Sequence, residues 1–522
     1  MRYSFVIDHN RCIGCHACTV ACKEEHNVPV GVFRTWVKYI EKGEFPATSR
    51  HFGVMRCNHC DAAPCVDICP TQALYYRNDR IVDFDNSRCI GCQSCMQACP
   101  YDALYIDPTT STAAKCNFCA HRIELKLEPA CVVVCPTRAI SAGDLDDPQS
   151  NVGTMIATQK VAVRKPHKAT QPKLFYAGIE GDFLQPAMMI PQESSLFAEH
   201  HPAASPGGLQ AGVARRAPGS ARVVYDVAHP PPWDALSAVY LWTKSIAGGI
   251  LLVAAFLIWL LTKGDAHAGG VLFRVASPAA ALAFIGITTA ALIGHLKRPD
   301  RFYYILIKPN PRSWLVWGTW ILIAYSAFAA GWLACGFEGL PLPTAIVAAA
   351  AILGAASAGY SGFLFAQAKG RDLWQSPLFL WILLAQAAAT GSASLLIMSA
   401  LTGAPVSEPG VAVTDVTSAL ERFLCVSAAL HAMLILSQIA LPQYTAEARE
   451  AVAAMTRRRR GRVFWSGVIF SGSFLPIVMI LCTSSGGGPR IGIDVGAAVL
   501  VLAASFIFDE AWIAAGQIPA LS

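Results

Sequence analysis

The distribution of hydrophobic positions divides the chain into two parts. After Ser237 the sequence contains eight long apolar runs, each near the ~20 residues that a helix needs to cross the hydrocarbon core of a bilayer. The runs cover residues 237–261, 271–294, 313–335, 343–368, 377–401, 417–440, 463–483 and 491–515. Because Trp and Tyr also gather near several of their ends, as at membrane interfaces, the pattern predicts an all-α bundle of eight transmembrane helices over residues 233–522.

The first part of the chain has a different pattern, in which apolar positions alternate over short stretches. Residues 73–85, ALYYRNDRIVDFD, and residues 103–108, ALYIDP, predict short strands. Residues 181–232 are rich in Pro, Ala and Gly and show no periodicity, which is typical of a tethering linker. We therefore expect a small α+β domain over residues 1–180, then the linker, then the membrane domain.

The composition agrees with a membrane protein, and the charges between the apolar runs predict its orientation. Of all residues, 54% are hydrophobic and 15% are charged, and the net charge of +6 gives no indication of a nucleic-acid partner. The connections on the N-terminal side of the bundle carry 13 Lys and Arg, against 4 on the other side. The first set is Lys297, Arg298, Arg301, Lys308, Arg312, Lys369, Arg371, Arg449, Arg457, Arg458, Arg459, Arg460 and Arg462; the second is Lys263, Arg274, Arg422 and Arg490.

Cytoplasmic loops carry an excess of positive charge. We therefore expect a multi-pass protein of the inner (cytoplasmic) membrane with its N-terminal domain facing the cytoplasm. The first residues, MRYSFVIDHNRC, contain no apolar signal-peptide stretch, which leads to the same expectation.

Cysteines carry the candidate chemistry of the N-terminal part. Sixteen of the nineteen lie in four groups: Cys12, Cys15, Cys18, Cys22; Cys57, Cys60, Cys65, Cys69; Cys89, Cys92, Cys95, Cys99; and Cys116, Cys119, Cys131, Cys135. The first and third groups share the spacing C-x2-C-x2-C-x3-C, and three groups end in Cys-Pro, which is the bacterial ferredoxin pattern. Three thiolates two residues apart hold one [4Fe–4S] cluster, and the fourth ligates a neighbouring cluster. Sixteen thiolates predict four clusters.

Zinc and disulfides are the two alternatives to iron–sulfur clusters. Zinc also binds C-x2-C pairs, but a zinc site usually draws on two separated pairs, whereas a third cysteine three residues further on suits a cluster. A disulfide framework needs an oxidising compartment and usually a secretory signal. Clusters are the favoured interpretation, and the remaining cysteines, Cys335, Cys425 and Cys482, are expected to be small apolar fillers.

On these cysteine motifs, residues 1–180 resemble the four-cluster electron-transfer subunits of the dimethyl sulfoxide reductase and polysulfide reductase type. The matching stretches are CNHCDAAPCVDICPTQAL, CIGCQSCMQACPYDA, KCNFCAHRI and GDLDDPQS. The repeated cysteine groups predict a duplicated ferredoxin-like fold, and the resemblance implies a large molybdenum or tungsten bis-pterin catalytic subunit as partner. It also implies four ligand sets: Cys12, Cys15, Cys18, Cys135; Cys22, Cys116, Cys119, Cys131; Cys57, Cys60, Cys65, Cys99; and Cys69, Cys89, Cys92, Cys95.

The apolar part resembles the NrfD and polysulfide reductase membrane subunits, on more diffuse motifs. These are WDALSAVYLWTKSIAGG, GHLKRPDRFYYILIKPNPRSWLVWGTW, GYSGFLFA and FDEAW. The resemblance implies electron exchange with the membrane quinone pool close to the iron–sulfur domain.

A quinone site needs hydrogen-bond donors and a proton source near the last cluster, and polar groups inside apolar spans are the candidates. We single out His295, Tyr360, Tyr240 and Lys244, with Asp509 and Glu510 as possible proton carriers. The alternative for His295 is an interfacial residue, and for Tyr240 and Lys244 an anchoring role. Asp234 is expected to cap a helix, and His431 to be a packed, hydrogen-bonded histidine.

The sequence thus predicts an electron-transfer and membrane-anchor subunit that passes electrons between a catalytic partner and quinone. Three alternatives stay open: quinol oxidation that feeds a reductase, a proton-translocating energy-coupling module, and an anchor without a quinone site.

Overall fold

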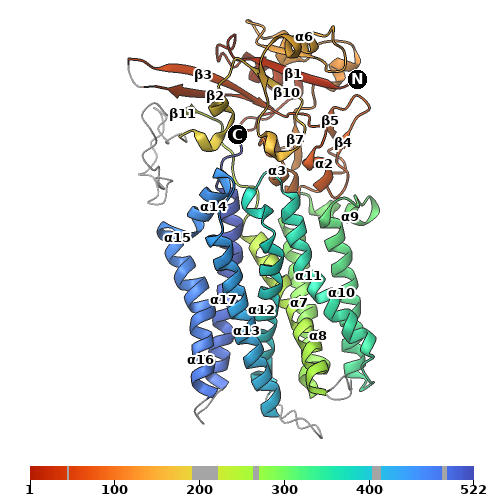
Figure 1. Cartoon of the computed structure of the whole chain (residues 1–522). Coiled ribbons are helices and arrows are strands. Elements are labelled where there is room, and N and C mark those ends of the chain that lie inside the picture. The colour runs from red at the N-terminus through yellow and green to blue at the C-terminus, as the bar shows by residue number, and fades with distance from the viewer. Residues whose placement is uncertain (44–45, 191–220, 263–269, 403–412, 485–490) are drawn as a thin grey trace.

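The computed structural model describes residues 1–43, 46–190, 221–262, 270–402, 413–484 and 491–522. Figure 1 shows two layers: a domain of short strands and helices, and below it a bundle of long, roughly parallel helices. Both termini lie in the upper layer or beside it. An α+β domain followed by a helical membrane domain was predicted, and this fold class is confirmed.

Four small sheets organise the described residues of the upper domain. The largest has the strand order β8-β1-β10-β9, in which β1 (Tyr3–Asp8) is parallel to β10 (Leu174–Ala177) and antiparallel to β8 (Ile140–Asp144). This sheet brings the two ends of the domain together. The remaining strand of this sheet is β9, Val161–Ala162.

Two hairpins follow the second and third cysteine groups, where the alternating patterns predicted strands. They are β4–β5, Leu74–Tyr76 with Val82–Phe84, and β6–β7, Leu104–Asp107 with Thr112–Lys115. Short helices contain cysteines or, in the case of α4, directly follow one; they are α1 (Ala17–His26), α2 (Pro64–Ile68), α3 (Ser94–Ala98), α4 (Ala120–Glu124) and α5 (Ala130–Val133). The domain core consists of cysteines, aliphatic residues and a few aromatic residues such as Phe5, Phe118 and Tyr176.

The described ends of the predicted linker are not free tethers, and the expectation of a plain linker is wrong there. Strand β11 (Arg222–Tyr225) pairs antiparallel with β2 (Thr35–Lys42), which in turn pairs with β3 (Ser49–Arg56). Val223 and Phe183 are buried together with Ile40 of β2. Four residues of strand are too few to show a period, so nothing in the sequence indicated this pairing. Residues 191–220 of the predicted linker lie outside the described part.

In the described part of the chain, eight helices are long and apolar enough to cross a membrane, as predicted. They are Ala235–Leu260, Leu272–His295, Trp314–Phe337, Thr344–Gln367, Leu378–Thr402, Val416–Ala440, Arg460–Cys482 and Ile491–Gln517. The first span belongs to α7 (Ala235–Thr262), which packs against α8 (Ser277–His295), α11 (Thr344–Gln367), α12 (Leu378–Thr402) and α17 (Ile491–Gln517). The other helices named below are α10 (Trp314–Phe337), α13 (Val413–Ala440), α14 (Ala446–Thr456) and α15 (Arg458–Val463).

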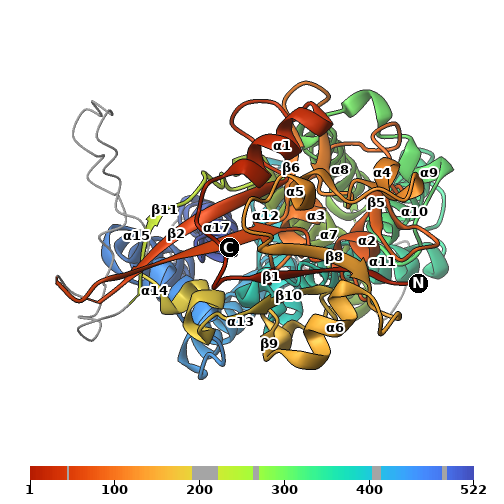
Figure 2. The same ribbon diagram turned by 90° about the horizontal axis from the view of Figure 1, so that it is seen from above.

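Two adjacent glycines let α7 lie in the centre of the bundle. A Cβ on Gly249 would overlap the Ala387 carbonyl oxygen of α12, and one on Gly248 would stand 2.5 Å from the Gly354 oxygen of α11. Small residues permit such close helix approach in membranes, where packing rather than the hydrophobic effect holds helices together. Viewed from above (Figure 2), the upper domain covers the ends of these helices, and the β2–β3 hairpin extends toward α14 and α15.

Candidate functional site: cysteine quartets and a polar network in the bundle

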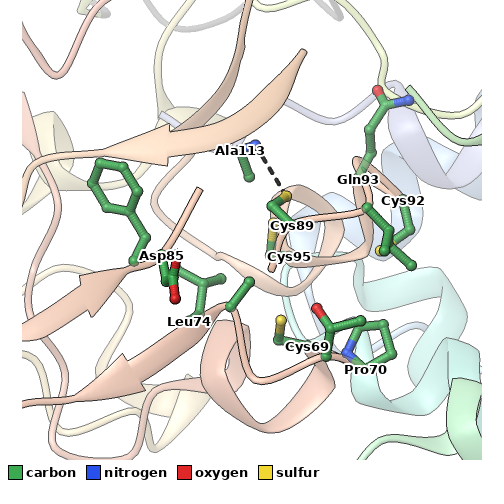
Figure 3. Close-up of a pocket in the computed structure, with 13 residues that line it drawn as sticks. Cys69, Pro70, Leu74, Asp85, Cys89, Cys92, Gln93, Cys95 and Ala113 are labelled. Atoms are coloured by element: carbon green, nitrogen blue, oxygen red, sulfur yellow. Dashed lines mark hydrogen bonds between the residues drawn. The ribbon is translucent and has the colours of Figure 1, made fainter. Parts of the chain in front are cut away.

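The structure gathers the sixteen cysteines into four quartets, each drawn from two groups of the sequence. Site 1 is the pocket lined by Cys12, Cys15, Cys18 and Cys135, and site 4 is the pocket lined by Cys69, Cys89, Cys92 and Cys95 (Figure 3). In site 2, Cys22 lies within electrostatic range of Cys116, Cys119 and Cys131. In site 3, Cys65 lies within range of Cys57, Cys60 and Cys99. These are the sets that the family resemblance implied.

The four sites form a series. Cys18 of site 1 is an electrostatic neighbour of Cys131 in site 2, and Cys116 of site 2 is a neighbour of Cys57 in site 3. Cys65 of site 3 is in the same way a neighbour of Cys95 in site 4. The order is therefore 1-2-3-4, with site 4 next to the bundle.

The residues at these sites fit iron–sulfur clusters. Gly91 N–H and Ala113 N–H donate to the Cys89 sulfur at 3.4 and 3.3 Å, and Ala139 N–H donates to the Cys135 sulfur at 3.2 Å. Gly14 and Gly91, which occupy the same place in the two repeats, have φ values of 69° and 68° and turn the loops in the left-handed conformation. Amides directed at sulfur stabilise thiolates, which are the ligands that clusters require.

Burial disfavours free thiolates at these positions. It raises the pKa of Cys18 to about 11 and that of Cys92 to about 12, so these sulfurs would hold protons until a metal group replaced them. Among the described residues, no three His, Cys, Asp or Glu side chains lie close enough to hold a single metal ion.

Site 4 is joined to the bundle through the backbone carbonyls of its cysteine loops. The Asn310 side chain, in the loop before α10, donates to the Cys69 carbonyl at 2.8 Å. The Lys297 and Arg298 amides, directly after α8, donate to the carbonyls of Gly91 and Ile90 at 3.3 and 3.2 Å. Both cysteine loops of site 4 therefore rest on helix ends of the membrane domain.

A second contact runs through Gln97, which lies in α3 between ligands of sites 4 and 3. Its side chain accepts from Arg371 Nε at 2.8 Å and donates to the Gln517 side chain at 2.6 Å. Burial lowers the pKa of Arg371 to about 10, although the Asp102 charge opposes that change. Several of the loop cations from which the membrane orientation is predicted thus also bind the upper domain.

His295 ends α8 close to site 4. Its Nδ1 lies 3.3 Å from the Asp234 carboxylate, which also accepts from the Leu236 amide at the start of α7. Its Nε2 is buried and has no hydrogen-bond partner among the described residues. Asp234 therefore caps the helix, as expected, and also holds the imidazole, while the other ring nitrogen has no partner in the described part of the chain.

Tyr240, Tyr360 and Lys244 meet inside the bundle. The Tyr240 hydroxyl is hydrogen-bonded to that of Tyr360 and lies 2.9 Å from the Ser361 hydroxyl. Lys244 is fully buried, donates to Ser361 and to the Ala358 carbonyl, and lies 4.5 Å from the centre of the Tyr360 ring. Ser361 was missed in the sequence, where only its position beside Tyr360 could have indicated it.

The other polar candidates separate into two kinds. Asp509 is fully buried, accepts from Gln386 at 2.8 Å and lies within electrostatic range of Lys244, whereas Glu510 is exposed. His431 packs edge-on against Phe508, but its Nε2 has no hydrogen-bond partner among the described residues, contrary to expectation. Within the described part of the chain, no hydrogen bond joins His295 to the Tyr240 network.

Fold and site together define a multi-pass membrane protein with a ferredoxin-like iron–sulfur domain. Residues 224–519 match the family model described as polysulphide reductase, NrfD, and the chain belongs to this family. Two models of 4Fe-4S dicluster domains match residues 11–74 and 49–145. The predicted fusion of a ferredoxin-type domain with an NrfD-type membrane domain is confirmed.

The curated relatives cover the iron–sulfur part. A tetrathionate reductase subunit of Salmonella typhimurium is 46% identical over 192 residues, which are 36% of this chain and 76% of the relative. A polysulfide reductase polypeptide of Wolinella succinogenes is 41% identical over 33% of this chain and 93% of its own length. A putative dimethyl sulfoxide reductase iron-sulfur subunit of Halobacterium salinarum is 37% identical over 43% and 94%. These relatives are subunits of reductases.

Proposed function

We propose that the chain passes electrons through four [4Fe–4S] clusters at sites 1 to 4 between a catalytic partner and membrane quinone. Bound clusters would supply one-electron redox chemistry. The observation that carries the proposal is the contact between site 4 and the segment that follows His295: the Lys297 amide, two residues beyond this histidine, donates to the Gly91 carbonyl between two ligands of site 4. An electron leaving site 4 is thus delivered to the helix end that carries His295.

Quinone reduction consumes two electrons and two protons for each quinol formed. The buried Nε2 of His295 suits a quinone carbonyl, because Asp234 holds the other ring nitrogen and keeps the ring oriented. Tyr240, Tyr360 and Lys244 form a second set of proton-bearing groups, and we propose that they bind the quinone or replace the proton that His295 donates. The residues that the sequence indicated for the quinone site thus act at two depths of one site.

The partner is proposed to dock on site 1. Cys15 is exposed and Cys12 and Cys135 are half-buried, so this end of the series is open to another protein. Exposed apolar side chains surround it: Ile13, Val20, Val133 and Val134. Such a patch on a soluble face is typical of a protein interface. The relatives are reductase subunits, and we propose, as the resemblance of the cysteine motifs implies, that this partner is a large molybdenum or tungsten bis-pterin oxidoreductase subunit.

A reconstituted electron-transfer assay tests the proposal. The purified, anaerobically reduced chain is mixed with a water-soluble quinone, and we expect the cluster absorbance to return as quinol forms, with about sixteen iron atoms per chain. Clusters that ferricyanide oxidises but quinone does not would contradict the quinone role, and stoichiometric zinc would contradict the clusters.

We also propose that the iron–sulfur domain faces the cytoplasm. Tyr444, between α13 and α14, is 97% exposed on the side of this domain, and Leu340, between α10 and α11, is 50% exposed at the opposite end. In a Cys482→Ser background, a membrane-impermeant maleimide should label Leu340→Cys but not Tyr444→Cys in intact spheroplasts. The reverse labelling would contradict the orientation.

A second function, proton translocation coupled to electron transfer, is favoured by the buried pair Lys244 and Asp509. Ionisable residues inside a membrane are costly and commonly belong to proton paths. In sealed vesicles, proton uptake beyond the two protons consumed for each quinone would support it, and uptake of two only would exclude it.

A further inference from the structure

Arg56 is the last residue of β3 and directly precedes Cys57. Its side chain is fully buried. Nη1 donates to the Cys131 sulfur of site 2 at 3.1 Å, and the guanidinium lies 4.7 Å from the centre of the Phe5 ring. Nε and Nη2 have no hydrogen-bond partner among the described residues.

The charge of Arg56 needs a counter-charge, because a guanidinium stays protonated in proteins and a buried, unpaired charge is strongly destabilising. Within the described part of the chain, no carboxylate forms an ion pair with Arg56. The groups that act on its charge are the sulfurs of Cys131 and Cys116 in site 2 and of Cys18 in site 1. Its counter-charge is therefore the thiolate ligands of these two sites and whatever metal group they hold.

The other cations near the cysteines are arranged differently. Lys115 is also fully buried, but its ammonium donates to the carbonyls of Val82 and Cys116 rather than to a sulfur. At site 4, Arg298 acts on the Cys89 sulfur from the protein surface, where it pairs with Asp300. Water and the carboxylate screen that charge, whereas Arg56 is buried and has no carboxylate partner among the described residues.

We propose that Arg56 raises the reduction potentials of the clusters at sites 1 and 2, and most strongly at site 2, so that electrons reside there rather than at site 4. The inference rests on the proposed function, since it presupposes clusters at these sites. Reduction adds one negative charge to a cluster, and a fixed cation in a region of low dielectric constant stabilises the reduced form more than the oxidised one. Arg56 acts through the ligands and is a tuning residue, not a catalytic one.

An EPR-monitored redox titration of the full chain tests the proposal. In Arg56→Gln, which keeps a donor and loses the charge, we expect two of the four clusters to become harder to reduce, by at least tenfold in the reduced-to-oxidised ratio at a fixed potential. That ratio corresponds to about 59 mV for a one-electron couple. The other two clusters should titrate as in the native chain. Unchanged potentials in a variant with full iron content would overturn the proposal.

Two further variants separate charge from shape. Arg50→Gln removes an arginine from the same strand, but one that is exposed and paired with Glu41, and it should change no potential. Arg56→Lys keeps the charge and should titrate close to the native chain. If Arg56→Gln fails to assemble its clusters, the Arg56→Lys variant decides. Native-like potentials in Arg56→Lys support the proposal, and lowered potentials or failed assembly in it overturn the proposal.

The iron content of the native chain tests the proposed function separately. About sixteen irons with unshifted potentials in Arg56→Gln would refute only the role of Arg56. Far fewer irons in the native chain would refute the four-cluster proposal itself.

Discussion

The iron–sulfur domain and the bundle are ordered by different forces. Helices that carry cysteines in the upper domain have 4 to 10 residues, too few to be stable alone, whereas bundle helices such as α8 and α7 have 19 and 28. A long apolar helix satisfies its own backbone hydrogen bonds in the membrane. We expect the order of the loops in the upper domain to depend instead on the metal groups that their cysteine sulfurs bind. Loss of metal should therefore loosen the iron–sulfur domain and leave the bundle largely unchanged.

The largest expected effect comes from breaking site 4. Cys69→Ala should lose about four irons and abolish quinone reduction, because the series is cut at its membrane end. Hydrogen exchange should increase in the loops around Cys69 and Cys89 while the α7 amides stay protected.

Cys335→Ala is the matched control for this variant. Cys335 is a half-buried residue of α10 outside the quartets, so the change should leave iron content and activity unaltered. Full iron content in Cys69→Ala would contradict the ligand set of site 4.

The second prediction concerns the place where the two domains meet. His295→Gln keeps a donor of similar size but cannot carry a proton at neutral pH. We expect all four clusters to assemble and quinone reduction to fall by about 10²–10⁴-fold, as on loss of a positioned acid–base group. Stopped-flow oxidation of the reduced clusters by quinone measures this directly.

His431→Gln changes another buried histidine of the bundle, packed on Phe508, and should leave the rate almost unchanged. A normal rate in His295→Gln would move the quinone to the Tyr240 network.

The same contrast explains what the sequence could predict. Cysteine spacing and apolar length are local signals, so the cysteine groups and the eight spans of the described residues could be predicted, the spans to within two or three residues of those observed. The presence of Cys22 and Cys116 in the same quartet depends on tertiary contacts, and it could be predicted only from the family resemblance. Strand β11 and Ser361 lack any pattern of their own.

The loop cations show how one signal can have two causes. Arg301 donates to the Asn86 carbonyl at 2.7 Å and Arg371 to Gln97, so both bind the iron–sulfur domain. A loop cation can thus serve docking as well as membrane orientation. A count of loop charges cannot separate these two causes. The orientation therefore requires the labelling experiment.

The third prediction tests how the segment after β11 is held to the iron–sulfur domain. His229 Nδ1 lies 2.7 Å from Asp102, and Asp226 lies on its other side. Burial lowers the His229 pKa, but the two carboxylates raise it by more, to about 9. A raised pKa means that the charged contact contributes fully below the unfolded pKa near 6.5 and is lost as the pH rises through about 9.

His229→Gln should therefore weaken the β11 segment by up to about 3 kcal/mol at pH 6 and hardly at all at pH 10. Hydrogen exchange of the β11 amides at the two pH values measures the difference. Equal effects at both would show that the contact does not depend on the imidazolium charge.

The smallest predicted effect lies within the bundle and asks whether its polar network serves the quinone. Tyr360→Phe keeps the ring that packs on Gly318 and removes one hydroxyl, while the Tyr240 hydroxyl keeps Ser361 as a partner. The loss of one neutral hydrogen bond is worth about 1 kcal/mol, which corresponds to a weakening of quinone affinity by roughly fivefold with the maximal rate nearly unchanged. Tyr325→Phe is the matched control, since this buried tyrosine of α10 donates to the Ala247 carbonyl of α7, a bond of the same kind without a proposed role. If both variants bind quinone as well as the native chain does, the Tyr240–Tyr360 pair is a structural contact between α7 and α11, and His295 and Lys244 remain as the candidate quinone ligands.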